Sequence, residues 1–244
     1  MARICVVDTE TTGLPRWDGG TARVVEVGAV ILEADGSEVA AFESVVNPGE
    51  YALKVADREA LRLNRLNAEH LLKAPAVVSV SMQLSAWLAA HETRVMTSFN
   101  RGFDFNPLLL GAPEWLGSDP DIRLAPCLQL SVEKIFIGAA SRSTFSDYDF
   151  GAQKHWLTLR DAVGRIAALK QPTYNMLTRP TGDPPSLIGL HTALADARAA
   201  AYVARFLMPW LQDPQSWKPL VKSSVRTTLT PMTRAQLAEL AKLG

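Results

Sequence analysis

Cysteine is scarce in this sequence: among 244 residues there are two, Cys5 and Cys127, and both have apolar neighbours. Two thiols cannot build the network of disulfides that stabilises small secreted domains, so we expect a reducing compartment and core packing for both residues. The N-terminus lacks the pattern of a secretory signal peptide, and no apolar run is long enough to cross a bilayer. These absences predict a cytoplasmic, soluble protein that does not bind membranes.

An excess of charge of either sign is also absent, because 25 lysine and arginine residues balance 25 aspartate and glutamate residues. Without an overall positive field the chain is not expected to hold long duplex nucleic acid nonspecifically, so any contact with nucleic acid should be local. Hydrophobic residues make up 48% of the chain, which is ordinary for a globular protein with a substantial core.

The first part of the chain has the apolar periodicity of a strand meander followed by helices. Alternating and β-branched residues predict three early strands, over 3–7, 23–33 and 37–46. Helical spacing follows over 57–72 and 76–90, and another strand is expected over 94–99. The order of these elements predicts a mixed sheet.

The second part of the chain is less regular. Glycine, proline, aspartate and serine are frequent in 111–152, so we expect a connection there, more than core, around the apolar segment 128–137. A helix is predicted over 156–169, and the proline-rich segment 171–190 is a candidate active-site flap. An alanine-rich helix should run from Thr192 to Met208 and end at Pro209.

Two carboxylates, Asp8 and Glu10, stand one residue apart directly after the apolar run Ile4-Cys5-Val6-Val7. Side chains two residues apart on a strand share a face, so both acids should point to one place. Two like charges held together favour a bound cation. The same spacing at exposed positions is common, but here a buried strand precedes the pair and a Thr-Thr-Gly turn follows it.

Further acids and one histidine occur at informative positions later in the chain. Asp104 ends an Asn-x-x-Phe-Asp motif that follows a predicted strand, and His191 precedes Asp196 by five residues. Five residues on one helix correspond to a rotation of about 140°. We therefore expect Asp196 inside the alanine-rich helix and His191 on the loop that leads into it, where the histidine could move when substrate binds.

With these motifs in this order, the sequence resembles the DEDDh family of 3′-5′ exonucleases, which includes the proofreading epsilon subunit of bacterial DNA polymerase III and ribonuclease T. The matching motifs are Asp8-x-Glu10-Thr-Thr-Gly-Leu, Asn100-x-x-Phe103-Asp104 and His191-x-x-x-x-Asp196. The resemblance covers about 3–207. It implies an α/β, ribonuclease H-like fold in which a mixed sheet is flanked by helices and the acids gather at one sheet edge.

The resemblance also implies the residues' roles. Asp8, Glu10, Asp104 and Asp196 would be catalytic and would bind two divalent cations, Mg²⁺ or Mn²⁺, while His191 would be the general base. Carboxylate oxygens suit these hard cations, and two ions can hold the attacking and leaving oxygens of a phosphoryl displacement. An unperturbed histidine has a pKa of about 6.5 and can take a proton from water near neutral pH.

By the family's pattern a further group of residues should contact the terminal nucleotide: Thr11, Thr12, Leu14, Asn100 and Phe103. For each of them a purely structural role is an open alternative, since Thr-Thr-Gly suits a turn, Phe103 suits a core and Asn100 could brace its own turn. Phe99 stands where proofreading relatives often carry a histidine, so the resemblance is not specific to that subfamily.

Taken together, the motifs predict a metal-dependent 3′-5′ exonuclease that releases nucleoside 5′-monophosphates from single-stranded ends, with DNA slightly favoured over RNA. An RNA-trimming or oligonucleotide-degrading enzyme, and a non-catalytic scaffold for nucleic acid or a polymerase, are the alternatives. We expect an exonuclease domain over 1–212, with a linker and helical tail over 213–244. The tail either packs on its own domain or docks on a polymerase or another assembly.

Overall fold

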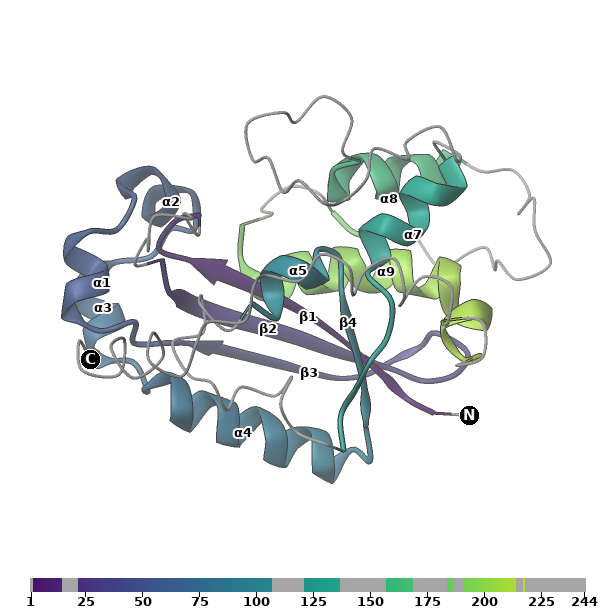
Figure 1. The fold of residues 1–244 in the computed structure, drawn as a ribbon, viewed down its shortest axis with the longest axis horizontal. Coiled ribbons are helices and arrows are strands. Elements are labelled where there is room, and N and C mark those ends of the chain that lie inside the picture. Colours follow the sequence, from purple (N-terminus) through teal and green to yellow (C-terminus); the bar gives the residue numbers. More distant parts are fainter. Residues whose placement is uncertain are drawn as a thin grey trace, which may run out of the picture.

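The structure of the chain is a computed structural model that describes residues 2–14, 22–106, 121–136, 157–168, 184–186, 191–213 and 217. Figure 1 shows a twisted sheet with helices on both faces. Among the described residues no helix is long and apolar enough to cross a membrane. Of the predicted linker and tail over 213–244 only Asp213 and Trp217 are described, and of the predicted flap over 171–190 only 184–186.

The described strands form one five-stranded sheet of order β3-β2-β1-β4-β5. The strands are β1 Ile4–Thr11, β2 Val24–Leu32, β3 Glu38–Val45, β4 Val95–Ser98 and β5 Arg123–Leu124. The first three pair antiparallel, whereas β4 runs parallel to β1 and β5 parallel to β4. The predicted mixed sheet with flanking helices is therefore confirmed.

Helices cover both faces of the sheet (Figure 1). They are α1 Glu50–Lys54, α2 Arg58–Leu63, α3 Ala68–Lys73, α4 Val77–Ala90, α5 Arg101–Asp104, α7 Leu128–Phe136, α8 Leu159–Ala168 and α9 Ala193–Leu211. The long helix α9 packs on β1 and β2 together with α7 and α8, and α4 covers the opposite face. Two layers of core result, one on each side of the sheet.

The alternation of side chains along β1 divides it between these two cores. Ile4 and Val6 pack in the core under α9, while Cys5 and Val7 pack in the core under α4. Both faces are apolar because a central strand with helices on both sides meets no water. Burial raises the pKa of the Cys5 thiol, consistent with the packing role that the sequence predicted.

Two predicted elements differ in extent from those observed. Strand β1 continues to Thr11, so Asp8 and Glu10 lie within the strand and not beyond its end. The expected helix over 57–72 is two short helices, α2 and α3, because the Asn64 side chain bonds the Thr11 carbonyl and Asn67 caps α3. The interruption serves to hold the turn that follows β1.

Two further expectations about the second part of the chain are wrong. The segment expected to be a connection contains α7, whose Leu128 and Val132 are fully buried against the rest of the core. Helix α9 does not end at Pro209 but continues to Leu211. A proline removes one helical hydrogen bond, and burial of Leu211 in the core offsets that loss.

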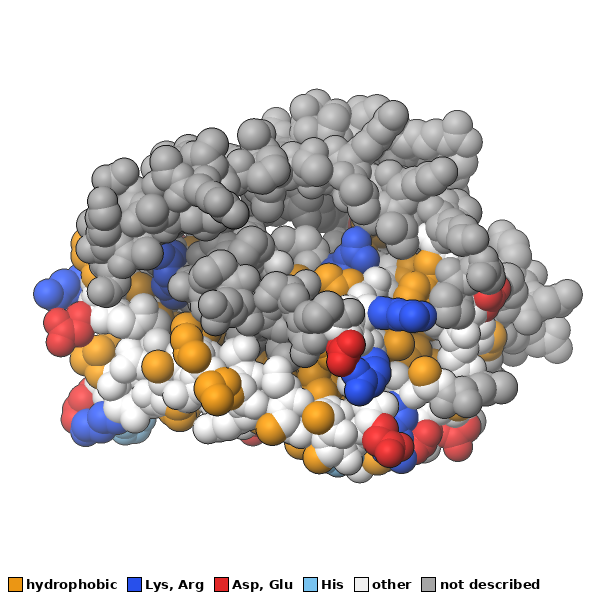
Figure 2. Space-filling view, turned by 60° about the horizontal axis from the view of Figure 1, so that its bottom comes forward, with side chains coloured by type: hydrophobic (Ala, Val, Ile, Leu, Met, Phe, Trp, Pro, Cys, Tyr) orange, Lys and Arg blue, Asp and Glu red, His pale blue; other side chains and the backbone are white. Residues whose placement is uncertain are grey.

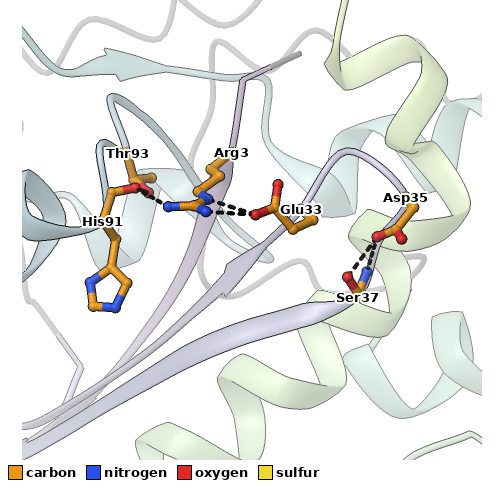
Figure 3. A network of polar contacts seen from close by, with 6 residues as sticks. All are labelled: Arg3, Glu33, Asp35, Ser37, His91 and Thr93. Carbon is orange, nitrogen blue, oxygen red and sulfur yellow. Dashed lines mark hydrogen bonds and ion pairs between the residues drawn. The ribbon is translucent and has the colours of Figure 1, made fainter.

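The beginning of β1 is fixed by a polar network at the end of the strand away from Asp8 and Glu10 (Figure 3). The Arg3 guanidinium donates to the Glu33 carboxylate and to the His91 carbonyl, at distances of 2.8 and 2.9 Å. These contacts connect β1 with the end of β2 and with the end of α4. The register of the central strand is thereby held at its start.

The described surface shows no single-signed charge on the face drawn in Figure 2, where lysine and arginine side chains lie among aspartates and glutamates. This arrangement agrees with the equal numbers of acidic and basic residues.

Candidate active site

Along the sheet face that α9 covers, the side chains change from apolar to acidic. Read along β1 and β2, the opposed pairs are Ile4 with Leu32, Val6 with Val30, Asp8 with Gly28 and Glu10 with Glu26. Directly opposed residues of antiparallel strands share a face. The apolar floor under α9 therefore turns acidic where β1 ends, on the middle strand of the sheet. Strand β4 pairs with β1 only from Ile4 to Val7, so Asp8 and Glu10 lie past the end of β4, where β1 pairs with β2 alone.

Helix α9 brings a further carboxylate to this floor. Its first turn lies directly over Gly28, where an added Cβ would come within 2.2 Å of the Ala193 carbonyl carbon. Only glycine permits so close an approach of the helix to the strand. Asp196 lies in that first turn and is half-buried, so the missing side chain of Gly28 lets α9 place it beside the acids of β1.

Asp104 reaches the same region from the short helix that follows β4. Its carboxylate is 3% exposed and accepts hydrogen bonds from the Thr9 amide at 3.1 Å and from the Thr9 hydroxyl at 2.9 Å. Thr9 lies between Asp8 and Glu10 on β1. These two bonds fix Asp104 to the strand that carries the other acids.

His191 precedes α9 on the loop side of its cap, as the spacing predicted. Thr192 is the N-cap of the helix, and the His191 amide donates to Asp196 Oδ2 at 3.1 Å. A ring nitrogen of His191 and carboxylate oxygens of Glu10 and Asp196 lie within 4.8 Å of one another. His191 is exposed and has a φ of 83°, a left-handed conformation that costs a non-glycine residue energy and recurs at functional sites.

The acids are close enough to oppose one another's ionisation. Burial, followed by the charges of Asp104, Asp196 and Glu10, raises the pKa of Asp8 well above its ordinary value. Burial and the neighbouring carboxylates raise the pKa of Glu10 to about 8.

The remaining two acids are shifted in the same direction. Burial raises the pKa of Asp104 to about 7 although the Thr9 hydrogen bonds work against it, and burial also raises the pKa of Asp196. Because burial and mutual repulsion disfavour the ionised forms of these carboxylates, the cluster gains from a cation that neutralises it.

The donor set fits a divalent metal. Asp196 Oδ1 is buried and accepts no hydrogen bond in the described part of the chain, while its other oxygen accepts from His191. A buried carboxylate oxygen without a donor is costly unless a cation binds it. Carboxylate oxygens are the ligands that Mg²⁺ and Mn²⁺ prefer. Glu10, His191 and Asp196 form the closest group, and Asp8 and Asp104 adjoin it.

The residues predicted to contact a nucleotide surround the turn after β1 and the start of α5. Thr11 and Thr12 are buried, and their hydroxyls bond the Gly13 carbonyl and the Arg23 amide. Leu14 is 61% exposed next to this turn. Phe103 packs against the core under α4, and Asn100 precedes α5 without a side-chain cap bond. Each threonine hydroxyl thus has a structural bond, and the role of all five toward a nucleotide stays a prediction.

Sequence reasoning missed Glu26. Its side chain is 6% exposed, lies opposite Glu10 and accepts a hydrogen bond from the Ala193 amide at 3.3 Å. Burial raises its pKa, and this amide bond opposes the shift. The signal was present in the sequence, because Glu26 is the one charged residue in the apolar strand Val24–Leu32.

No protein-family model and no curated protein matches this sequence. Solved structures do match the fold. The nuclease domain of 3′hExo, described as a DEDDh family member bound to rAMP, superposes with a TM-score of 0.56 at 15% identity, over 88% of this chain and 94% of that domain.

Two other nucleases match over most of this chain. E. coli Exonuclease I in complex with a dA16 oligonucleotide gives a TM-score of 0.55 at 11% identity, over 91% of this chain and 43% of its own. Cell-death related nuclease 4 gives 0.51 at 12% identity, over 84% of this chain and 63% of its own. The chain therefore spans less than half of Exonuclease I. With its strand order and flanking helices, it has the ribonuclease H-like fold of the DEDDh exonucleases.

Proposed function

We propose that the protein is a metal-dependent 3′-5′ exonuclease that hydrolyses the terminal phosphodiester bond of single-stranded nucleic acid and releases nucleoside 5′-monophosphates. One observation carries the proposal: buried and half-buried carboxylates from β1, α5 and α9 come together beside His191 in the fold of the DEDDh exonucleases.

Asp8, Glu10, Asp104 and Asp196 would hold two divalent cations. When bound, these ions supply positive charge to the scissile phosphate and to the attacking and leaving oxygens. The carboxylates set where that charge lies, and Thr9 fixes one of them to the strand. Their pKa shifts predict that binding of cations releases protons.

His191 would take the proton from the attacking water. Its ring lies beside the Glu10 and Asp196 carboxylates that are proposed to hold the cations. Because His191 is exposed at the start of α9, the proton can pass on to solvent after the step. Leu14, exposed beside the turn after β1, would contact the terminal base.

The substrate proposal places single-stranded DNA slightly ahead of RNA. Both polymers occur among the structural matches: Exonuclease I is bound to a dT13 oligonucleotide in one and a 3′-exonuclease recognises a histone mRNA stem-loop in another. The alternative of an exoribonuclease therefore belongs to the same test.

The test is digestion of 5′-labelled DNA and RNA oligonucleotides of several lengths, in Mn²⁺, in Mg²⁺ and with EDTA. We expect stepwise shortening from the 3′ end that EDTA stops, with nucleoside 5′-monophosphates as products and DNA shortened faster. Faster shortening of RNA would favour the exoribonuclease. Retention of label without any shortening in either metal would favour the non-catalytic scaffold.

A further inference from the structure

Glu26 lies where the sheet meets the start of α9, outside the set of residues assigned above to metal or proton transfer. It is opposite Glu10 in the register of β1 and β2, so the two side chains are on the same face. Gly28, two residues further along β2, is on that face too, directly under Ala193. Strand β2 therefore contacts α9 at two positions of one face: through the backbone of Gly28, which has no side chain, and through the carboxylate of Glu26.

The Glu26 carboxylate contacts α9 at a backbone amide that has no hydrogen-bond acceptor within the helix. Ala193 is the first residue of α9, and its amide has no acceptor within the helix. Glu26 Oε2 accepts from this amide at 3.3 Å, across 167 residues of sequence. The Thr192 hydroxyl accepts from the Ala195 amide. The amides of the first turn of α9 are thus bonded partly by the cap residue and partly by strand β2. The positive end of the helix dipole also favours the negative charge of Glu26.

A contact that fixes the position of Ala193 also fixes the position of Asp196. The two residues are in the same helical turn, and the Asp196 amide already bonds the Thr192 carbonyl at 3.0 Å. The Gly28 contact sets how closely α9 approaches the sheet, but it leaves the helix free to slide along it. The hydrogen bond from Ala193 removes that freedom, because it connects the helix to a side chain that is itself opposite Glu10.

We propose that Glu26 is a positioning residue that holds the first turn of α9, and with it Asp196, against the carboxylates of β1. In its effect on cation binding this inference rests on the proposed function. A buried glutamate on α7 provides a matched comparison: Glu133 is also 6% exposed and accepts from a backbone amide, that of Leu157, at 2.9 Å. Helix α7 does not carry any of the proposed metal ligands.

The experiment compares Glu26→Ala, Glu26→Gln and Glu133→Ala in the full chain. Amide hydrogen exchange of Ala193 and Leu157 is measured by NMR without metal, and the Mn²⁺ concentration for half-saturation is measured by calorimetry. We expect Glu26→Ala to speed exchange at Ala193 and to raise the half-saturating Mn²⁺ concentration on the order of ten-fold, as loss of a residue that orients a metal ligand does. Glu133→Ala should speed exchange at Leu157 alone.

Glu26→Gln is the rescue, because its amide oxygen still accepts from Ala193, and we expect both readouts within about two-fold of the unmodified chain. Unchanged exchange at Ala193 in Glu26→Ala would overturn the proposal, as would exchange that rises without any change in Mn²⁺ binding. Equal loss of Mn²⁺ binding in the Gln and Ala variants would overturn it in favour of direct ligation. If the unmodified chain neither binds Mn²⁺ nor shortens oligonucleotides, the proposed function fails, and exchange at Ala193 decides the positioning role.

Discussion

The two oxygens of the Asp196 carboxylate have different surroundings. Oδ2 accepts from the His191 amide, whereas Oδ1 is buried without a donor in the described residues. Replacing Asp196 by Asn keeps the size of the side chain but removes its charge. We expect hydrolysis to fall more than about 100-fold, while the fold is retained.

The Asp196→Asn variant is expected to be more stable than the unmodified chain when no metal is bound. Without metal, the clustered acids repel one another, so removing one of them should raise the thermal midpoint of the chain in EDTA. Thermal unfolding followed by circular dichroism measures this. Asp35→Asn, on the exposed turn between β2 and β3, is the control and should change neither activity nor midpoint appreciably. Normal hydrolysis by Asp196→Asn would remove this residue from the metal site.

His191 should be replaceable with loss of turnover but without loss of the fold. We expect His191→Ala to lower kcat about 10²-fold to 10⁴-fold, the usual contribution of a general base. The matched control is His91→Ala, because the His91 ring bonds the Trp87 carbonyl at the end of α4 and faces no acid of the site. Single-turnover hydrolysis at saturating Mn²⁺ compares the two, and an equal effect of both variants would contradict the assignment of the base.

At the level of elements, the periodicity of the sequence predicted the long, regular strands and helices. The early strands, α4 and the body of α9 follow from residue spacing, and His191 and Asp196 are divided between loop and helix as five residues of separation require. The turn at Asn64 and the continuation of α9 through Pro209 were not predictable, because distant contacts decide them. Glu26 could be noticed as the one charged residue of an apolar strand, but residue spacing does not reveal its contact with Ala193, 167 residues away.

The approach of α9 to β2 gives a prediction at this scale. Gly28→Ala would place a methyl group 2.2 Å from the Ala193 backbone, so we expect a loss of about 3 kcal/mol in the free energy of unfolding, together with weaker metal binding. Gly164→Ala, in α8, meets nothing within 4 Å and should stabilise the chain by about 0.5–1 kcal/mol. Urea unfolding of both variants is the measurement, and a Gly28→Ala variant as stable as the unmodified chain would contradict the close contact.

For the whole molecule, the acid cluster predicts opposite pH dependences for folding and for metal binding. The pKa of Asp104 is raised to about 7 and that of Glu10 to about 8, so the folded chain holds protons that an unfolded chain releases near pH 4. In EDTA, stability should therefore fall as the pH rises from about 5 to 8, through the folded pKa values. Thermal midpoints measured across this range test the sign, and a midpoint that rises with pH would contradict it.

Metal binding should strengthen over the same range, because the ions require ionised carboxylates. The most direct measurement of the central claim is calorimetric titration of the full chain with Mn²⁺ at pH 6 and pH 8, repeated with Asp8→Asn and Asp196→Asn. We predict two ions per chain, tighter binding and greater proton release at the higher pH in a range of buffers, and loss of at least one ion in each variant. A chain that binds no Mn²⁺ at pH 8, or variants that bind it as the unmodified chain does, would contradict the account.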